Sequence, residues 1–465
     1  MKFRPLFAVL AAALAAGCGR VAAPQPVAHV ATSFKTAAVP QGFMWGVSTA
    51  GYQWEGQDPG SQWGKWDQAG KTVERNPLGA DGYRRYEQDA DLTKGLGCNT
   101  FRTSIEWARI EPREGEYDQA AIAHYHALLG ALRARGLEPV ITLMHFSYPG
   151  WLDADGGWES PKAAGRFAKY AAFVAKEFGH DIKWYLTYNE PNVYLMGGYL
   201  AGMMPPGRQD PLGGLRALRN MVTGHKLAYA AIHANDPEAQ VSFNMYTAEY
   251  AVGLRADADP SSTPEQQAKQ RITSDLFFMD QLSATPEHKG TLDYASFDYY
   301  CRFKVTLPFA FPRADTWEVY PEGFYKALHR YHDRYHLPVL VAENGMATWD
   351  LAPRADRWTR SAYTVTHVKQ LQRAVAEGVP VLGYVHWSIT DNYEWGSFSP
   401  RFGLFSVDCR HQNFDRVAAD GVQAFKSIIA EGGVTDAITK RYPAPGLVPL
   451  PAPWEPGGGS AVHTY

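Results

Sequence analysis

The sequence predicts a single (β/α)8 barrel, and three observations support that fold class. The chain has 465 residues, 45% of them hydrophobic, which is enough for one large barrel or for two to three ordinary domains. Short β-rich runs recur roughly every 40 to 55 residues. Helical patterns lie between these runs, and strands that alternate with helices are typical of a parallel sheet covered by helices.

The predicted strands are eight short runs rich in β-branched and aromatic residues. In chain order they are Phe43–Ser48, Thr100–Ile105, Val140–Met144, Lys183–Thr187, Val241–Asn244, Tyr294–Phe297, Val339–Ala342 and Val381–Val385. Between them, residues 120–133 and 162–174 carry apolar residues at helical spacing. A doubly wound open sheet is the alternative. However, the chain has no strand–GxGxxG–helix unit, and Gly60–Lys65 is one residue too short for a phosphate loop.

Polar residues gather where the predicted strands end. The strands of such a barrel run parallel, so their carboxyl ends form one mouth, and active sites lie at that mouth. Any one polar residue there could be structural, but a set drawn from all eight strands indicates a functional site. The set comprises Gln53 and Glu55, Arg102, His145, Asn189 and Glu190, Asn244, Asp298 with Tyr299 and Tyr300, Glu343 and Asn344, and Trp387 with Glu394 beyond it.

The composition narrows the class of partner. The net charge is −3 and there is no long basic run, which argues against nucleic acid and against an anionic membrane surface. The 14 Trp and 26 Tyr residues are many for this length; they fit core packing or, as a function, stacking on sugar rings. Cys98, Cys301 and Cys409 lie far apart without CxxC spacing. We expect three buried thiols, with one disulfide as the alternative, and neither a metal nor a cofactor.

The two ends of the chain have their own patterns. A basic Met1–Arg4 precedes an apolar stretch at residues 6–16 that is short for a membrane span. Ala15-Ala-Gly-Cys18 resembles a bacterial lipoprotein cleavage site, although Ala15 stands where Leu, Ile or Val is usual. We expect an exported protein, anchored by a lipid on Cys18 and facing the periplasm or cell surface; an ordinary secretory peptide is the alternative. The expected divisions are a signal peptide at 1–17, a tether at 18–38, one catalytic domain at 39–442 and a Pro- and Gly-rich tail at 443–465.

Two acids at predicted strand ends form a candidate catalytic pair. Glu190 stands in Thr-Tyr-Asn-Glu-Pro after the fourth strand, and Glu343 stands in Val-Ala-Glu-Asn-Gly after the seventh. Paired carboxylates at a barrel mouth suit cleavage of a glycosidic bond. One acid protonates the leaving oxygen, while the other attacks the anomeric carbon or activates a water molecule.

Five segments in order resemble glycoside hydrolase family 1, the β-glucosidase family. Individually the tripeptides Asn-Glu-Pro and Glu-Asn-Gly are weak motifs, but the ordered set is specific, and the resemblance runs from about Phe43 to Gly432. The segments are Phe43–Gly56, Phe101–Ile110, Thr187–Pro191, Val339–Gly345, and Gly383–Trp395 followed by Arg401–Gly403.

The resemblance implies a retaining β-glycosidase on a TIM barrel that acts on small carbohydrates or on aryl or alkyl β-glycosides, with no cofactor. It assigns Glu190 as general acid/base and Glu343 as nucleophile. Arg102 and Tyr300 are then expected to hold Glu343 ionised, while the charge of Glu343 keeps Glu190 protonated. Asn244 and Asp298 are expected to support the site. The implied sugar-binding residues are Gln53, His145, Asn189, Trp387, Glu394 and Trp395.

Three positions depart from the family pattern. Phe146 follows His145 where Trp is usual, which leaves the choice among gluco-, galacto-, manno- and fucosides open. Asp298 replaces the usual Asn, and an unpaired acid there would raise the pKa values of both catalytic acids unless Arg302 compensates it. Met203–Gly207 replaces a His-Ala-Pro-Gly turn on the aglycone side.

The rival functions are a sugar-binding lipoprotein on an inactive scaffold and an enzyme that transfers glycosyl groups to alcohols or sugars. Both acids are present, which favours catalysis over binding alone. Transfer and hydrolysis share one glycosyl–enzyme intermediate, so the sequence does not separate them. The negative Glu394 beside Trp395 argues against 6-phosphoglycosides.

Overall fold

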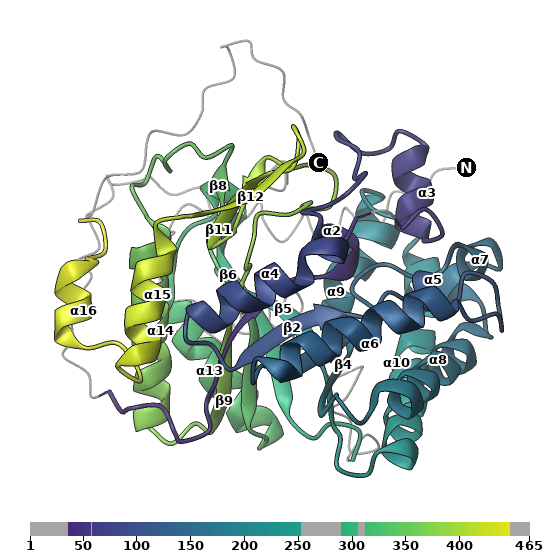
Figure 1. Ribbon diagram of the computed structural model, residues 1–465, viewed down its shortest axis with the longest axis horizontal. Helices are drawn as coiled ribbons and strands as arrows, with labels where there is room; N and C mark the ends of the chain where they lie inside the picture. Colours follow the sequence, from purple (N-terminus) through teal and green to yellow (C-terminus); the bar gives the residue numbers. More distant parts are fainter. Residues whose placement is uncertain (1–35, 57, 253–289, 306–311, 447–465) are drawn as a thin grey trace, which may run out of the picture. The chain divides into compact units, whose positions relative to one another are not determined.

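The computed structural model describes residues 36–56, 58–252, 290–305 and 312–446, and its centre is a closed barrel of eight parallel strands (Figure 1). Each strand pairs in parallel with its neighbours in chain order, and the last closes on the first. This confirms the predicted (β/α)8 fold class. The barrel strands are β1 (Met44–Ser48), β2 (Thr100–Ser104), β3 (Glu138–Thr142), β4 (Trp184–Asn189), β5 (Gln240–Val252), β6 (Ala295–Val305), β7 (Val339–Asn344) and β9 (Val381–Trp387).

Helices cover the outside of the barrel, and Figure 1 shows α4 and α6 crossing in front of β2. The two segments predicted from their helical spacing are α6 and α8, which extend the prediction by a few residues. The larger helices are α4 (Gly82–Gly95), α6 (Gln119–Ala134), α8 (Ala163–Phe178), α10 (Pro211–Asn235), α13 (Pro321–Tyr335), α14 (Arg360–Ala376), α15 (Gly421–Ala430) and α16 (Asp436–Arg441).

Short elements follow the carboxyl ends of the strands and build up the mouth, at the upper end of the view in Figure 1. β8 (Thr348–Trp349) pairs with β10 (Pro400–Arg401), and β11 (Phe405–Asp408) pairs with β12 (Asn413–Ala418). The short helical elements are α2 (Gly51–Trp54), α3 (Gln62–Gln68), α5 (Trp107–Ile110), α7 (Gly150–Ala154), α9 (Pro191–Leu195), η1 (Gly157–Glu159), η2 (Met196–Ala201) and η5 (Ala314–Thr316).

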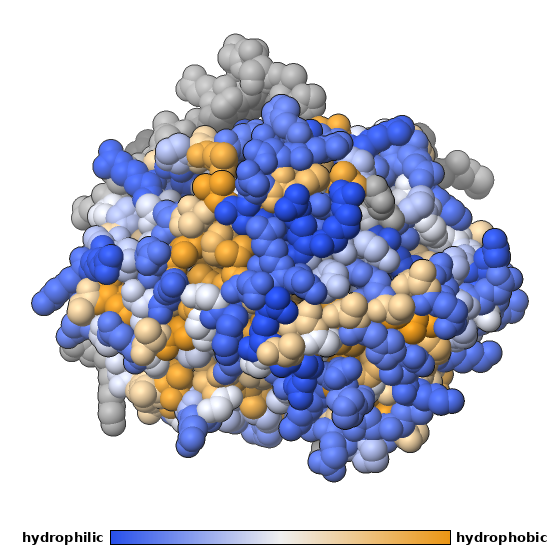
Figure 2. All heavy atoms as spheres, in the orientation of Figure 1, coloured by the Kyte–Doolittle hydropathy of each residue, from blue (hydrophilic) through white to orange (hydrophobic). Residues whose placement is uncertain are grey.

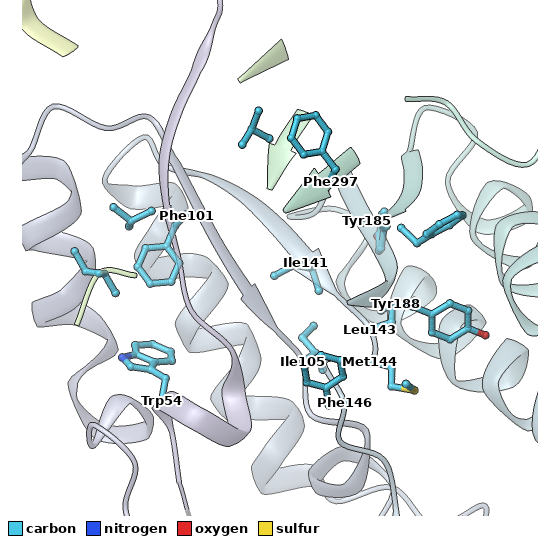
Figure 3. Close-up of a cluster of buried hydrophobic side chains, with 14 of the residues drawn as sticks. Trp54, Phe101, Ile105, Ile141, Leu143, Met144, Phe146, Tyr185, Tyr188 and Phe297 are labelled. Carbon is cyan, nitrogen blue, oxygen red and sulfur yellow. The ribbon is translucent and has the colours of Figure 1, made fainter. Parts of the chain in front are cut away.

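Alternation along the strands builds two apolar layers. Phe101, Ile141 and Tyr185, from neighbouring strands, point outward into the main core under the helices (Figure 3). The side chains at alternate positions on these strands point to the other face. They come from strands all round the barrel and still contact one another, so they lie inside it. This interior cluster, which lies below the polar groups of the mouth, contains Met44, Val140, Leu186, Tyr294, Leu340, Ala342 and Val385.

Two strands are longer than the sequence predicts. β5 runs to Val252 and β6 to Val305, well past the predicted ends at Asn244 and Phe297. Beyond the barrel these two strands continue to pair in parallel with each other, with a shift in register after Thr247. The extension places Asp298, Tyr300 and Arg302 within a strand rather than in the loop that follows it.

The remaining predictions about the body of the chain concern its thiols and its surface. Cys98, Cys301 and Cys409 are free and buried, as predicted. Hydrophilic residues cover most of the face shown in Figure 2, with apolar residues in smaller groups between them. Within the described ranges, each helix is either too short or too polar to cross a bilayer. Cys18, the signal segment and nearly all of the predicted tail lie outside the described residues.

Candidate active site

The candidate site begins with Arg102, which rises from β2 into the centre of the barrel and is fully buried. A buried guanidinium needs acceptors for its donors, and four other strands, β3, β4, β5 and β7, supply them. Nη1 donates to Glu343 Oε1 at 2.5 Å on β7, and Nη2 donates to Asn189 Oδ1 at 2.7 Å on β4. Its weaker partners are Thr142 Oγ1 at 3.2 Å, Asn244 Oδ1 at 3.3 Å and the Ala342 carbonyl at 3.3 Å.

Glu343 is held by two donors at the end of β7. Besides Arg102, the hydroxyl of Tyr300 donates to Glu343 Oε2 at 2.5 Å. Burial raises the pKa of Glu343, while the charge of Arg102 and the hydrogen bonds of Tyr300 and Arg102 act to lower it. Each carboxylate oxygen of Glu343 therefore has its own donor, which confirms the contacts expected from the sequence.

Glu190 lies where β4 gives way to α9. Its backbone is left-handed (φ 39°, ψ 57°), which breaks the strand, and Pro191 then begins the helix at a position that suits proline. The Glu190 carbonyl accepts the amides of Val193 and Tyr194, but its side chain caps no helix amide. The carboxyl group is thus left for the mouth of the barrel.

The two acids lie close together in the mouth. Single carboxylate oxygens of Glu190, Glu343 and Asp298 all lie within 4.8 Å of one another. Burial, then the negative charges of Asp298 and Glu343, raise the pKa of Glu190 well above its ordinary value. Arg102 and Tyr300 donate hydrogen bonds to Glu343, whereas no described residue donates such a bond to the Glu190 side chain, so Glu343 is the acid that ionises first.

Asp298 is the third acid of this cluster, on β6. Asn244 Nδ2 donates to Asp298 Oδ2, and the register of the strands sets Asp298 beside Glu343. Arg302 does not compensate it, because that guanidinium forms a bidentate pair with Glu318 at 2.7 and 2.8 Å. Burial and the charge of Glu343 therefore raise the pKa of Asp298 well above its ordinary value.

The donors around these three acids bear on whether a metal would bind there. Arg102 and Tyr300 already occupy the two oxygens of Glu343, and Asn244 occupies one oxygen of Asp298. The buried guanidinium supplies the positive charge that a cation would otherwise bring. The arrangement suits acid–base and nucleophilic chemistry by carboxylates better than metal coordination.

A second group of predicted residues forms a polar and aromatic cluster. Glu394 accepts from Trp387 Nε1 at 3.1 Å and from Gln53 Nε2 at 3.2 Å. Burial raises the pKa of Glu394 to about 8. Near pH 7 this pKa favours the neutral carboxyl group, so the negative charge that the sequence suggested there is weak.

Aromatic rings pack together in this cluster. The ring of His145 lies nearly parallel to Trp387 and Trp395, with centroids 5.7 and 5.8 Å away. Phe146, where the family usually has Trp, packs edge-on to Trp395 at 4.9 Å. Burial, with the charge of Arg102, lowers the pKa of His145 well below its ordinary value, so the imidazole is neutral.

Some residues at strand ends do not join the site. Glu55 is fully buried in an ion pair with Arg109 at 2.9 Å. Asn344 instead donates outward to the Tyr299 carbonyl and the Tyr363 hydroxyl.

Two residues that support the site are not among those predicted from the sequence. Thr142 accepts a hydrogen bond from Arg102, and Asn392 accepts one from Gln53. Thr142 could have been predicted, because side chains two residues apart on a strand lie on the same face and Val140 on β3 points inward.

Comparison with known proteins agrees with this geometry. The model of glycosyl hydrolase family 1 matches residues 35–295 and 304–434. The chain belongs to that family. The family model thus spans both acids, and the chain is a glycoside hydrolase with the retaining β-glycosidase fold and chemistry of family 1.

The chain matches its family 1 relatives over nearly their whole length. A β-glucosidase A of Thermotoga maritima is 27% identical over 85% of this chain and 99% of its own. A β-galactosidase of Pyrococcus woesei is 29% identical over 78% of this chain and 88% of its own. Among solved structures, the T. maritima family 1 β-glucosidase with isofagomine lactam has a TM-score of 0.76 at 26% identity, covering 86% of this chain and 100% of that one. A β-glycosidase from Pyrococcus horikoshii has a TM-score of 0.77 at 28% identity, covering 88% and 98%.

Proposed function

We propose that the protein hydrolyses the terminal β-glycosyl residue of unphosphorylated glycosides, most readily glucosides, with Glu343 as nucleophile and Glu190 as general acid/base. The observation that carries this proposal is the separation of the two acids. Their carboxylate oxygens approach within 4.8 Å. Retaining enzymes need about 5 to 5.5 Å between the carboxyl groups, whereas inverting enzymes need about 6.5 to 9.5 Å to admit a water molecule.

In the first step, the Glu343 carboxylate attacks the anomeric carbon, and Glu190 gives its proton to the glycosidic oxygen. The bond to the aglycone breaks, the aglycone leaves as an alcohol or phenol, and Glu343 becomes a glycosyl ester. In the second step a water molecule attacks the same carbon. Glu190 takes the proton of that water, and the ester bond breaks to release Glu343 as a carboxylate.

The neighbouring amides orient the sugar. Asn189 Oδ1 accepts from both Arg102 and Asn244 Nδ2, the latter at 2.7 Å. The amide nitrogen of Asn189 is thereby the end left to donate to the sugar 2-hydroxyl. That contact strengthens as positive charge develops on the ring, and so it favours the transition state over the bound substrate.

The surroundings of Glu394 support unphosphorylated sugars. Its bonded neighbours are Trp387 and Gln53, and Gln53 in turn bonds Asn392 at 3.3 Å. None of the side chains of Trp387, Gln53 and Asn392 is basic. A 6-phosphate would bring about two negative charges to a buried carboxyl group without a cation to balance them.

A panel of aryl β-glycosides tests the proposal. We expect turnover of the glucoside, weaker turnover of the galactoside and fucoside, and kcat/KM at least about 100-fold lower for 6-phosphoglucoside, because charge burial costs several kcal/mol. The initial sugar product, followed by NMR, should be the β-anomer, as retention requires. Tight sugar binding without turnover of any member would instead identify a binding protein.

We also propose that the chain is exported and anchored through a diacylated Cys18. The support is the basic, apolar and Ala-Ala-Gly-Cys order of residues 1–18. Cells that express the full chain should incorporate labelled palmitate into it, and Cys18→Ser should abolish the label and release the protein from the membrane fraction. A wild-type protein that carries no label and stays in the soluble exported fraction would show an ordinary secretory peptide.

A further inference from the structure

Asp298 presents a carboxyl group to the mouth that the two-acid mechanism does not use. It is fully buried on β6, between Asn244 and the acid pair. Asn244 holds its Oδ2, whereas its Oδ1 is buried and has no donor among the described residues. A buried carboxylate oxygen without a donor is costly, so a proton or a donor is expected there.

The carboxyl group of Glu190 is a neighbour that could satisfy that oxygen, because single carboxylate oxygens of Glu190 and Asp298 lie within 4.8 Å of each other. The negative charge of Asp298 raises the pKa of Glu190. While Glu343 is ionised, two further carboxylates beside it would repel each other and Glu343 strongly, but a carboxylic acid and a carboxylate can share one proton. A pair of acids this close is expected to titrate in two steps that belong to both groups.

We propose that Asp298 is a positioning residue that shares the acid/base proton with Glu190. This inference rests on the proposed role of Glu190 and deepens it. In the resting site Arg102 and Glu343 form an ion pair, and Glu190 and Asp298 hold one proton between them. The shared proton keeps Glu190 in its acid form to higher pH and fixes the orientation of its carboxyl group toward the leaving oxygen.

The charges balance through both steps. When the shared proton passes to the leaving group, Glu190 and Asp298 are both carboxylates, while Glu343 becomes a neutral ester. Arg102 thus loses the charge of Glu343 but keeps the field of Asp298, which already acts on it in the resting site. When water attacks, its proton returns to the pair, the ester breaks and Glu343 again faces Arg102.

Other titratable or charged groups also face the pair. Among the described residues these are Arg102 on β2, Tyr246 on β5, Tyr300 on β6 and Glu343 on β7. Burial raises the pKa of both tyrosines well above the ordinary range, so they stay neutral. Glu343 ionises on the acid side of the profile. The alkaline limb of kcat/KM, which reports the acid of the free enzyme, is therefore assigned to the Glu190–Asp298 pair.

The test is Asp298→Asn, which keeps the size of the side chain and an oxygen for Asn244. Removing the negative neighbour lowers the pKa of Glu190, so the general acid is lost at lower pH. We expect the alkaline limb of kcat/KM for a phenyl β-glucoside to move down by about one pH unit or more. Glu318→Gln, which removes one charge from the Arg302 pair outside the site, is the matched control and should leave the limb in place.

Two further measurements keep failure of this inference distinct from failure of the proposed function. If Glu190→Gln loses activity on the phenyl glucoside but Asp298→Asn leaves the limb unmoved, the shared proton is overturned and the acid/base role stands. If Glu190→Gln keeps full activity, the proposed function itself fails. Should Asp298→Asn not fold, carbon-13 NMR of wild-type protein labelled at the glutamate carboxyls decides. A two-step titration of Glu190 is expected, and a single independent step overturns the inference.

Discussion

Replacing Glu343 with glutamine is expected to lower kcat/KM for every aryl β-glycoside by at least about 10⁴-fold. The amide is close to the carboxylate in size, and its oxygen still accepts a hydrogen bond from Arg102 or Tyr300. It is a poor nucleophile, however, so the glycosyl ester does not form. The measurement is initial rate against substrate concentration, with circular dichroism to show that the variant is folded.

A second variant, Glu343→Gly, tests the role of Glu343 as nucleophile through the stereochemistry of the product. Glu343→Gly leaves space for a small anion on the face of the sugar opposite the leaving group. With added azide, an activated aryl β-glycoside should undergo a single displacement and give the α-glycosyl azide. Glu318→Gln, a half-buried acid paired with Arg302, is the control and should retain wild-type activity without azide. A β-glycosyl azide from Glu343→Gly would assign the nucleophile to another residue.

The variants at Glu343 are also expected to be less stable than the wild type, because Arg102 loses its ion pair. Its guanidinium is fully buried, and in Glu343→Gln it loses its ionic partner. Leaving one member of a buried pair uncompensated typically destabilises a protein by about 3 to 5 kcal/mol. Asp298 still faces Arg102, so we expect the loss to lie toward the lower end of that range, measured as a shift in urea midpoint.

The strand order and the two acids could be predicted from the sequence because both depend on local patterns. Glu190 and Glu343 directly follow apolar strands, and parallel strands bring their carboxyl ends to one mouth whatever the details of packing. The ion pair of Arg102 with Glu343 follows from the same argument, since a charged side chain pointing into a barrel needs a partner at the mouth.

Other features depend on contacts that no local pattern encodes. The sequence left open whether Arg302 compensates Asp298, and the answer depends on where β6 ends. Because β6 continues past the barrel, Arg302 reaches Glu318 near η5 instead. The pairing of Asp298 with Glu190 likewise depends on the register of β4, β5 and β6 once the barrel closes. The raised pKa of Glu394 is a consequence of burial, which composition and spacing do not show.

Replacing Glu190 with alanine is expected to separate substrates by the basicity of their leaving groups. A dinitrophenolate leaves without protonation, so kcat/KM for the dinitrophenyl β-glucoside should change by less than about tenfold. An alkoxide needs the proton, so kcat/KM for an alkyl β-glucoside should fall by about 10² to 10⁴-fold. Steady-state and burst kinetics on the two substrates measure the difference.

The same variant should also slow the second step, because water loses its general base. With the dinitrophenyl glucoside, Glu190→Ala should therefore show a burst of phenol release and then a low kcat, with the glycosyl–enzyme detectable by mass spectrometry. Azide needs no base, so it should raise kcat and give the β-glycosyl azide, the product of two inversions. Glu343→Gly and Glu190→Ala thus yield opposite anomers from one substrate and one anion. If both variants gave the same anomer, the two carboxylates would not have the separate roles that their different environments indicate, with donors on both oxygens of Glu343 and an acid beside Glu190.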